Sequence, residues 1–409
     1  MTAPDVAPIS HQASSIHPVG TFRYLVVGGG MTADAACRGI RDHDTDGPIG
    51  LVGEEAFAPY ARPPLSKALW KGKDESSVWR GTEELGVELI VGRRVTSVDL
   101  DGRTATDDAG ETHSYEKLLL ATGGTPRRVE AWDDSVIYYR TLETYRRLHQ
   151  LAGEGVRAAV VGGGFIGSEV AAALALNGCD VSIVFPEVGV GAKLFPADLA
   201  RSVSEYYGSQ GVDVRPGRKV ESIARDGGTT VVTTDEGEIE ADVVVAGLGI
   251  VPRTELAEQA GLEVDDGILV DDRGRAGGRE DVFAAGDVAR FPVAALGGTR
   301  RVEHEDHANT HGRHVGANMA GADAPYDHLP FFYSDLFDLG YEAVGDVDSR
   351  LETLAEWAEP NRKGVVCYVE DERPRGFLLW DVWDRVDPAR DLIRAAEPVT
   401  AERVRALIG

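Results

Sequence analysis

The sequence contains little cysteine and no long apolar run. Its three cysteines, Cys37, Cys179 and Cys367, are far apart among 409 residues, so none belongs to a C-x-x-C or C-x-x-x-x-C pair. An enzyme that reduces disulfides needs a paired dithiol, and this spacing argues against one; small buried side chains are expected instead. No stretch approaches twenty consecutive apolar residues, which excludes a membrane-spanning helix.

Positive charge is also scarce. The chain has 42 Lys and Arg against 68 Asp and Glu, which gives a formal net charge of −26. Such an acidic protein is a poor partner for nucleic acid or for an anionic membrane, and neither is expected. Residues 1–21 lack the basic start and apolar core of a signal peptide, so they are predicted to form a disordered leader of a cytoplasmic protein.

The most informative stretch is Ala159–Leu174, AVVGGGFIGSEVAAAL. β-Branched residues lead to Gly162, Gly164 and Gly167 at G-x-G-x-x-G spacing, and an alanine-rich segment follows, which predicts a strand, a phosphate-binding turn and a helix. The three glycines permit the tight turn, the approach of a pyrophosphate and close helix–strand packing, respectively. Glu187, about 25 residues after Gly162, can accept the ribose hydroxyls of NAD and would repel the 2′-phosphate of NADP.

A second copy of this pattern occurs near the N-terminus. In YLVVGGGMTADAACRGI, Gly28, Gly30 and Ala33 take the three fingerprint positions, and Glu54 follows at the end of the strand IGLVGEE. A single glycine pattern is weak evidence, but two complete patterns with acidic partners are not expected by chance. The sequence therefore predicts that the chain holds two nucleotides.

Strand and helix patterns divide the chain into three regions. Residues 22–134 and 263–325 are predicted to form one nucleotide-binding domain, and residues 135–262 a second domain that is inserted into the first. Residues 326–409 contain aromatic, alternating segments such as FFYSDLF and GFLLWDV, which favour antiparallel strands in a small α+β domain. The predicted fold class is α/β, with two doubly wound Rossmann-like domains and this third domain.

Strand ends that carry glycine or a polar residue are candidate nucleotide contacts. The strand that ends at Thr122 and Gly123 can bring its backbone close to a ligand, and the strand before Gly249 ends in glycine as well. Lys67 is expected on a short helix that follows two prolines. Asp287 follows the strand VFAAG, where it can bond a ribityl hydroxyl of the first nucleotide or cap a helix.

A group of histidines and a group of aromatic residues could each serve either structure or the binding of a metal ion or cofactor. Four histidines recur at helical spacing, but HEDH is one residue short of the H-E-x-x-H zinc pattern, so no metal site is predicted. These histidines are His304, His307, His311 and His314. Four aromatic residues near the C-terminus form either part of the core or an aromatic belt beside a flavin, and they are Tyr333, Tyr341, Trp380 and Trp383.

Longer segments carry a family resemblance. They are ARPPLSKALW, ATGGTPR, GGGFIGSEVAAAL, VFPE, FAAGD, VEHEDHA, YSDL with GYEAVG, and LLWDVWDRVDPAR. Over residues 22–409 the chain resembles the FAD-dependent pyridine nucleotide oxidoreductases of the ferredoxin-reductase type, and most closely apoptosis-inducing factor and its bacterial relatives. The resemblance implies a glutathione-reductase-like arrangement of an FAD domain, an NAD domain and a C-terminal domain.

The resemblance also implies which residues bind the two cofactors. For FAD they are Gly28, Gly30, Ala33, Glu54, Glu55, Arg62, Lys67, Val95, Thr122, Gly123, Arg127, Asp287, His304, Glu305 and Tyr333. For NAD(H) they are Gly162, Gly164, Phe165, Ile166, Gly167, Glu169, Glu187, Lys193, Gly249, Glu303 and Glu342. The chain departs from the family at Tyr333, where tryptophan is usual, and in the loop after Leu336, which is one residue shorter than in the animal protein.

Lys67, Glu169 and His304 are the catalytic residues that the resemblance implies. Family members pair the lysine of P-P-L-S-K with the glutamate after the second fingerprint, so that an ammonium beside the flavin stabilises negative charge as hydride arrives. The carboxylate keeps this ammonium from being an unpaired buried ion. Phe165 is implied to cover the flavin until nicotinamide displaces it, and the helix that starts near Glu305 is implied to direct its N-terminus at the flavin.

The implied activity is that of an NADH-dependent FAD oxidoreductase. Its electron acceptor would be a ferredoxin or rubredoxin, or else a quinone. The rival interpretation is a redox sensor like apoptosis-inducing factor, in which NADH produces a long-lived charge-transfer complex and controls a homodimer. A monodehydroascorbate reductase or nitrite reductase-like activity is a third alternative.

Overall fold

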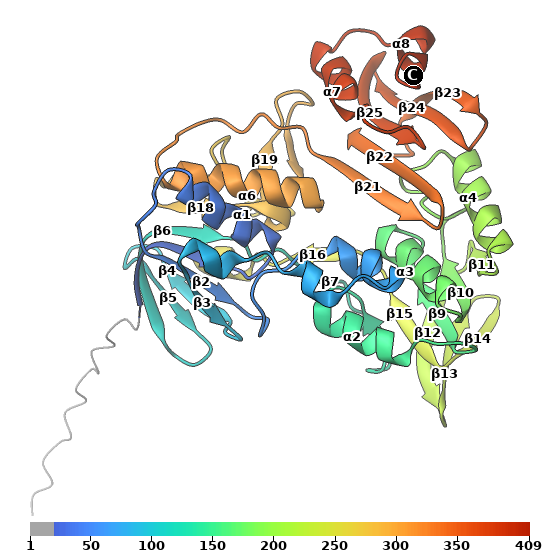
Figure 1. Ribbon diagram of the computed structural model, residues 1–409, viewed down its shortest axis with the longest axis horizontal. Helices are drawn as coiled ribbons and strands as arrows, with labels where there is room; N and C mark the ends of the chain where they lie inside the picture. The colour runs from blue at the N-terminus through green and yellow to red at the C-terminus, as the bar shows by residue number, and fades with distance from the viewer. Residues whose placement is uncertain (1–19) are drawn as a thin grey trace, which may run out of the picture.

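A computed structural model describes residues 20–409 of the chain (Figure 1). Nearly all of the predicted leader lies outside the described residues, but Gly20 and Thr21 already belong to strand β1 (Gly20–Val27). Two sheets with parallel central strands, the first of which also carries an antiparallel edge, and one antiparallel sheet form the frame of the molecule. The first two are called the parallel sheets below. Within the described range, no helix is both long and apolar enough to cross a membrane.

The first sheet is built around β1, whose apolar residues are buried on both faces. Across the sheet the strands are β3 (Val87–Val91), β2 (Ile49–Gly53), β1, β6 (Thr112–Leu120), β5 (Thr104–Asp107) and β4 (Val95–Asp99), with β18 (Val282–Ala284) pairing the end of β6. The order β3-β2-β1-β6 is parallel, as a dinucleotide-binding half requires. Helices α1 (Met31–Arg41) and α6 (Glu305–Met319) pack side by side against this sheet.

The second sheet is wholly parallel and repeats the same local design. Its strands are, in order, β11 (Asp213–Pro216), β10 (Asp180–Phe185), β9 (Arg157–Val161), β15 (Val243–Ala246) and β8 (Ile137–Tyr138). Its helices are α2 (Leu142–Leu151), α3 (Phe165–Leu176) and α4 (Ala197–Ser209). An antiparallel three-stranded sheet of β12 (Val220–Asp226), β13 (Thr229–Thr234) and β14 (Gly237–Ala241) packs beside it.

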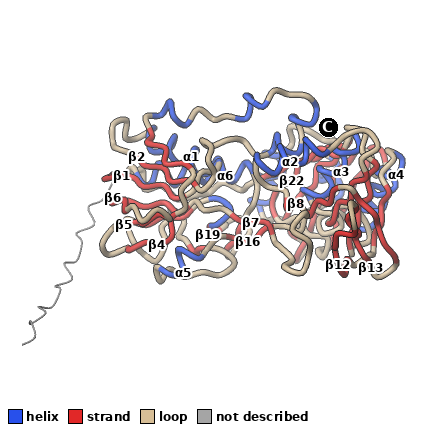
Figure 2. The backbone as a smooth tube through the Cα atoms, turned by 90° about the horizontal axis from the view of Figure 1, so that it is seen from below, coloured by secondary structure: helices blue, strands red, loops and turns tan. Residues whose placement is uncertain are grey.

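The two connections between the parallel sheets run side by side. Strand β7 (Gly124–Pro126) leaves the first sheet and β16 (Ile250–Pro252) returns from the second, and they pair antiparallel. Figure 2 shows this ribbon between the two sheets. The returning chain forms α5 (Glu255–Gln259), β17 (Ile268–Leu269), β19 (Ala289–Pro292) and β20 (Thr299–Arg301).

The C-terminal region is a five-stranded antiparallel sheet, as its alternating sequence predicted. The strand order is β21 (Phe331–Leu336), β22 (Leu339–Gly345), β25 (Arg373–Trp380), β24 (Lys363–Glu370) and β23 (Glu352–Glu359), with helices α7 (Val386–Ala395) and α8 (Ala401–Arg405) packed on it. Tyr341 and Trp380 are buried and stack with ring centroids 5.6 Å apart, so they belong to the core. Tyr333 and Trp383 are exposed.

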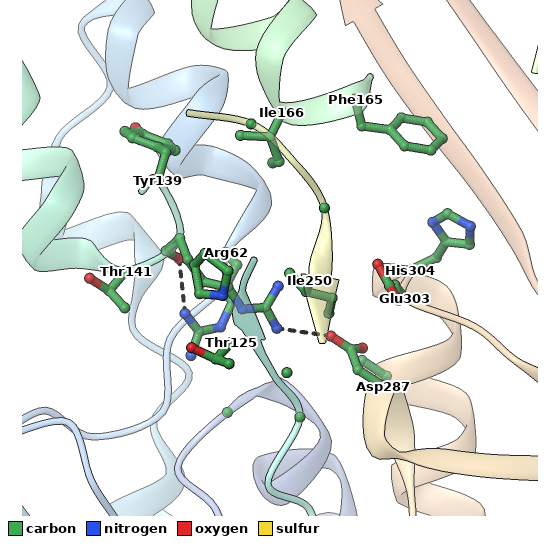
Figure 3. A pocket seen from close by; sticks show the side chains of 18 of the residues that line it. Arg62, Thr125, Tyr139, Thr141, Phe165, Ile166, Ile250, Asp287, Glu303 and His304 are labelled. Carbon is green, nitrogen blue, oxygen red and sulfur yellow. Dashed lines mark hydrogen bonds and ion pairs between the residues drawn. The ribbon is translucent and has the colours of Figure 1, made fainter. Parts of the chain in front are cut away.

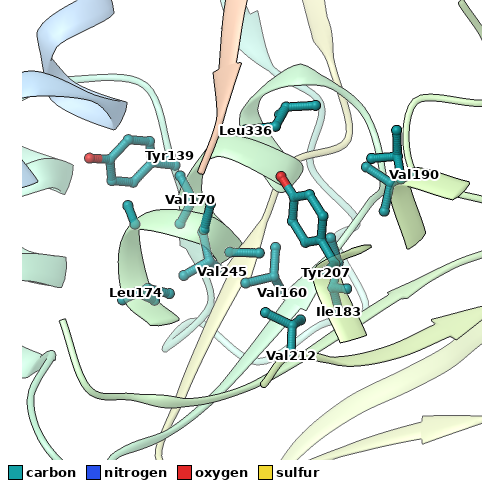
Figure 4. Close-up of a cluster of buried hydrophobic side chains, with 14 of the residues drawn as sticks. Tyr139, Val160, Val170, Leu174, Ile183, Val190, Tyr207, Val212, Val245 and Leu336 are labelled. Carbon is teal, nitrogen blue, oxygen red and sulfur yellow. The ribbon is translucent and has the colours of Figure 1, made fainter. Parts of the chain in front are cut away.

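One hydrophobic cluster joins the second parallel sheet to the other two parts of the fold. Val160 of β9 and Val170 of α3 lie at its centre, and Leu336 of β21 reaches it from the C-terminal sheet (Figure 4). Leu65 and Leu69 contribute to it from the segment that follows β2. The cluster therefore packs the C-terminal sheet against both nucleotide-binding domains and holds the three parts in a defined relative position.

Helices α1 and α6 cross so closely that only glycine fits at the contact. A Cβ atom on Gly316 would lie 2.1 Å from the carbonyl oxygen of Ala36. We expect Gly316→Ala to lower the free energy of unfolding by about 1–3 kcal/mol because the helices must separate. Urea denaturation measures this change. Gly208→Ala in α4, where a Cβ meets open space, should instead raise stability by up to about 1 kcal/mol, and equal effects of the two variants would contradict the packing argument.

Candidate functional site

A single cavity of about 1510 Å³ lies where the carboxyl ends of the two parallel sheets face each other. Both glycine turns line it, together with β21 of the C-terminal sheet and the residues before α6 (Figure 3). Its volume exceeds the ~300–1,000 Å³ typical of a pocket for one small ligand. The cavity is thus larger than a single small ligand requires, and its volume is compatible with two nucleotides.

The first glycine turn has the geometry that a bound pyrophosphate requires. Gly28 has a φ of +130°, and a Cβ on it would lie 2.1 Å from the carbonyl oxygen of Ala121. Gly30 is the N-cap of α1, and a Cβ there would meet nothing within 4 Å, so the backbone N–H groups of the first turn are accessible to an anion. Ala33 is fully buried in α1 and does not line the cavity, in keeping with a packing role.

The second glycine turn repeats this arrangement. Gly162 has a φ of +113°, and a Cβ on Gly167 would lie only 1.9 Å from the Gly162 carbonyl oxygen. Gly164 is the N-cap of α3 and faces open space. The N-terminus of α6, with His304 as its N-cap, also borders the cavity, and none of these three N-caps makes a side-chain hydrogen bond to its helix. The partial positive charges of these helix N-termini suit the phosphates of two dinucleotides, so the residues present fit FAD and a nicotinamide dinucleotide.

Acidic residues stand at both nucleotide sites, and each already has a cationic partner. Glu187 lies after β10 and its Oε1 is 3.3 Å from Lys193 Nζ. Glu54 follows β2 and forms an ion pair with Arg253, which reaches over from the chain after β16. Neighbouring Glu55 accepts hydrogen bonds from Tyr60 (2.5 Å) and Arg62 (2.6 Å). Arg253 was not predicted from the sequence.

Asp287 lines the cavity from the 3₁₀ turn η5 (Gly286–Val288), whose N-cap is Ala285. Asp287 is therefore not a helix cap, and its carboxylate is instead paired with an arginine at the cavity wall. It accepts a hydrogen bond of 2.9 Å from Arg140, and the carbonyl oxygen of Arg140 in turn accepts one of 3.0 Å from Arg62 (Figure 3). Arg140 is a further lining residue that sequence analysis missed.

Lys67 and Glu169 form the buried ion pair that the family resemblance implied. Lys67 Nζ lies 2.5 Å from Glu169 Oε1 and 5.6 Å from the centre of the Tyr333 ring. Lys67 does not lie on a helix, which corrects the prediction: it stands between the 3₁₀ turns η1 (Pro63–Ser66) and η2 (Ala68–Lys71). Consecutive prolines restrict the backbone there and expose this side chain to the cavity.

Aromatic rings form the wall between these polar groups. His304 stacks on Phe332 with ring centroids 4.2 Å apart, and Phe165 packs edge-on against both rings. Burial lowers the pKa of His304 to about 4, against the opposing effect of nearby carboxylates, so its imidazole is neutral near pH 7. The neighbouring Glu303 has a raised pKa because partial desolvation disfavours its charged form, although the guanidinium of Arg301 opposes this shift from 2.6 Å.

Most of the remaining predicted contacts line the cavity, but three do not. The lining residues are Val95, Thr122, Gly123, Ile166, Gly249, Glu305 and Tyr333. Arg127 is exposed and lies outside the lining, whereas Arg128 contributes to it. Glu342 also lies outside the cavity, in β22 directly opposite Tyr333. Gly167 is buried behind the second turn.

The histidine stripe of α6 points into the core. His307 and His311 are fully buried and stack with ring centroids 4.7 Å apart, beside Phe291 and Tyr326. Burial lowers the pKa of both, to about 3 for His311. His304 is not part of the stripe, because the helix begins after it. Among residues 20–409 no group of three or more His, Cys, Asp or Glu side chains is placed to hold a metal ion.

Comparisons with known proteins agree with this geometry. Residues 22–312 match the family described as pyridine nucleotide-disulphide oxidoreductase, and residues 315–363 match the C-terminal region of mitochondrion-associated apoptosis-inducing factor. All three cysteines are buried and free, and none lines the cavity. The chain thus shares the family's nucleotide-binding frame without a dithiol at the site.

Similar proteins include both oxidoreductases and apoptosis-inducing factors. The chain is 35% identical to apoptosis-inducing factor 1 of Dictyostelium discoideum, over 92% of this chain and 79% of the relative. It is 36% identical to peroxisomal monodehydroascorbate reductase 4 of Arabidopsis thaliana, over 87% and 79%. Putidaredoxin reductase, solved in covalent complex with putidaredoxin, superposes with a TM-score of 0.86 at 26% identity, over 95% and 96%. The chain belongs to the pyridine nucleotide-disulphide oxidoreductase family, as an FAD-dependent NAD(P)H oxidoreductase of the ferredoxin-reductase type.

Proposed function

We propose that the protein oxidises NADH and delivers the electrons one at a time to a ferredoxin-type protein. One observation carries this proposal: two dinucleotide turns meet in a single cavity beside the Lys67–Glu169 pair, and no cysteine lines it. Electrons from the nicotinamide therefore have no dithiol to enter and must leave for an acceptor outside the described chain. The class of reaction follows from the family relationship. The choice of NADH as the electron donor is argued from the residues of this cavity.

The residues divide into those that hold the nucleotides and those that set the charge between them. The turns at Gly28 and Gly162 hold the two pyrophosphates at helix N-termini. Bound FAD supplies the chemistry, because it accepts a hydride from a nicotinamide and can release electrons singly. The Lys67 ammonium offsets negative charge that arrives in the cavity, while Phe165 and Phe332 exclude water from the same wall.

A carboxylate in the second nucleotide site supports NADH over NADPH as the donor. Glu187 lines the cavity and is about a quarter exposed, so its carboxylate is available to ribose hydroxyls. A 2′-phosphate at this position would meet that negative charge. Lys193, its partner, is 81% exposed and is a solvated cation that contributes little net attraction.

A small iron–sulfur protein is the acceptor that we favour. The complex of putidaredoxin reductase with putidaredoxin supports this choice, since its reductase covers nearly the whole of the present chain. Rubredoxin, a quinone and monodehydroascorbate are the competing acceptors. At a net charge of −26, docking of an acidic ferredoxin would depend on local contacts and not on overall attraction.

Anaerobic double-mixing experiments distinguish these acceptors. Protein reduced with one equivalent of NADH is mixed with a [2Fe–2S] ferredoxin, rubredoxin, a quinone or monodehydroascorbate, and flavin absorbance reports its reoxidation. We expect ferredoxin to reoxidise the protein at least about tenfold faster than any other acceptor at equal concentration, which corresponds to about 1.4 kcal/mol of barrier. A faster reaction with quinone or with monodehydroascorbate would overturn the assignment of the acceptor.

The match of residues 315–363 to the apoptosis-inducing factor region supports one alternative, an NADH redox sensor. In that case reduced protein would keep a long-wavelength absorbance band for minutes in air, and NADH would convert monomer to dimer. Sedimentation velocity with and without NADH tests the second property. An unchanged sedimentation coefficient together with rapid reoxidation would exclude the sensor.

A further inference from the structure

The carboxylate of Glu169 has more partners than the lysine with which it pairs. We propose that Ser66 and Ser334 are positioning residues for NADH oxidation: they fix the Glu169 carboxylate and thereby fix the ammonium of Lys67 in the cavity. This inference rests on the proposed oxidation of NADH but not on the identity of the acceptor.

Three donors surround this carboxylate at short distances. Ser66 Oγ donates to Glu169 Oε2 at 2.5 Å, and Ser334 Oγ donates to Oε1 at 2.6 Å. Lys67 Nζ also contacts Oε1, at 2.5 Å. The two hydroxyls thus bind different oxygens, so together they define the plane and rotation of the carboxylate that faces Lys67.

Each of the three side chains comes from a different part of the fold. Ser66 ends the 3₁₀ turn η1 in the segment that follows β2 of the first sheet, Glu169 lies in α3 beside the second sheet, and Ser334 lies in β21 of the C-terminal sheet. The lysine is therefore held in place only when all three parts are docked. A strand of the C-terminal sheet takes part directly in the charge arrangement of the cavity.

Burial makes the hydroxyls hard to replace. Ser334 has 0% of its surface exposed, Glu169 has 5% and Ser66 has 7%, whereas Lys67 keeps 14% of its side chain exposed. Water cannot readily substitute for a missing hydroxyl in such a site, so an oxygen of the carboxylate would lose its partner. The carboxylate would then turn toward its remaining donors and draw the flexible lysine side chain with it.

Two buried phenols lie near the carboxylate, and the Ser334 hydroxyl opposes the pKa shift of one of them, Tyr341. Tyr207 and Tyr341 are buried beside Glu169, and burial, followed by its negative charge, raises the pKa of both well above the usual value. They are therefore neutral, and the Tyr207 hydroxyl donates to the Ser168 carbonyl oxygen at 3.0 Å. The charge opposite Glu169 within hydrogen-bond distance is that of Lys67.

A double-mutant cycle on the FAD-loaded protein tests the inference. The limiting rate of flavin reduction by NADH is measured anaerobically, without acceptor, for Ser334→Ala, Ser66→Ala, Lys67→Ala and the double variants. We expect each serine variant to slow reduction about tenfold, because a hydrogen bond to a charged group is lost. In the Lys67→Ala background the same changes should have less than about a twofold effect, since the serines act through the lysine.

Two further measurements separate positioning from loss of structure. The midpoint potential of bound FAD should become more negative in Ser334→Ala while the FAD-to-protein ratio stays at that of the unaltered protein. Thr234→Ala is the control: it removes a buried hydroxyl of β13 that donates to the Gly237 carbonyl oxygen in β14. This variant should leave the reduction rate and the midpoint potential unchanged. If Ser334→Ala does not fold, the same rate, midpoint potential and FAD content are measured on Ser66→Ala, and these values test the inference.

The outcomes that would overturn the inference are distinct. Equal tenfold effects in the presence and absence of Lys67, or an unchanged midpoint potential, would show that the serines act only on stability. A failure of NADH to reduce the unaltered protein would overturn the proposed function as well as this inference. A failure of ferredoxin to reoxidise it would affect only the acceptor.

Discussion

Lys67→Ala is expected to slow the reduction of bound FAD by NADH about 100-fold while FAD remains bound. The substitution removes the ammonium 2.5 Å from Glu169 and leaves a carboxylate with 5% exposure in the wall of the cavity. Negative charge that arrives with the hydride then meets a negative side chain in place of a neutralised pair. Removal of one such preorganised charge typically costs about 10²–10³ in rate. Stopped-flow absorbance under anaerobic conditions measures the effect.

Two companion variants identify the cause of this loss. Lys71→Ala removes an exposed lysine from the end of η2 and should leave the rate unchanged. Adding Glu169→Gln to Lys67→Ala should recover part of the lost rate, because the uncompensated charge is removed while the amide keeps an oxygen that accepts from one serine hydroxyl and an N–H that donates to the other. Loss of FAD together with a normal rate in reconstituted protein would contradict the assigned role of Lys67.

The sequence was sufficient to locate both nucleotide turns, because their requirements are local. Close backbone approach requires glycine at Gly28 and Gly162, both of which have positive φ, and the adjoining helices begin at Gly30 and Gly164. Such constraints act within a few residues of one strand–helix unit, so they leave a pattern that a single sequence displays. The alternating C-terminal segment similarly predicted antiparallel strands.

The missed residues make contacts across long sequence separations. Arg140 binds Asp287 from 147 positions away, and Arg253 binds Glu54 from 199. The serines that hold Glu169 are separated from it by 103 and 165 positions. No periodicity or motif in one sequence records such pairs, since they depend on how the connections between the sheets fold back.

Two predicted contacts, Arg127 and Glu342, lie outside the lining of the cavity, and their motifs did not indicate where these side chains point. Arg127 and Arg128 are adjacent loop residues that follow β7, and a motif that contains both does not indicate which of them lines the cavity. The structure places Arg128 at the cavity, over the ring of Tyr138. Glu342 pairs with Tyr333 across β21 and β22, yet Tyr333 lines the cavity and Glu342 does not. Directly opposite residues of an antiparallel pair share a face of the sheet, so strand pairing alone does not predict which of the two side chains reaches the cavity.

Glu187→Ala should lower the preference for NADH over NADPH about 100-fold, expressed as the ratio of the two kcat/KM values. The carboxylate follows β10 and lines the cavity beside the second glycine turn, where in the proposed function it would accept the ribose hydroxyls of NADH. Its removal forfeits hydrogen bonds to a charged acceptor, each worth about 1.5–3 kcal/mol, and also removes repulsion of the NADPH 2′-phosphate. We therefore expect the two effects to act together, with NADH efficiency falling and NADPH efficiency rising.

A charge-matched variant makes this prediction specific to the site. Glu221→Ala removes the same charge from an exposed position of β12 and should leave the selectivity ratio unchanged, because a remote surface charge is screened by salt. A comparable change in both variants would indicate a general effect of net charge on NADPH. If Glu187→Ala leaves the ratio unchanged, the carboxylate does not contact the ribose, and donor choice must depend on other residues around the second glycine turn.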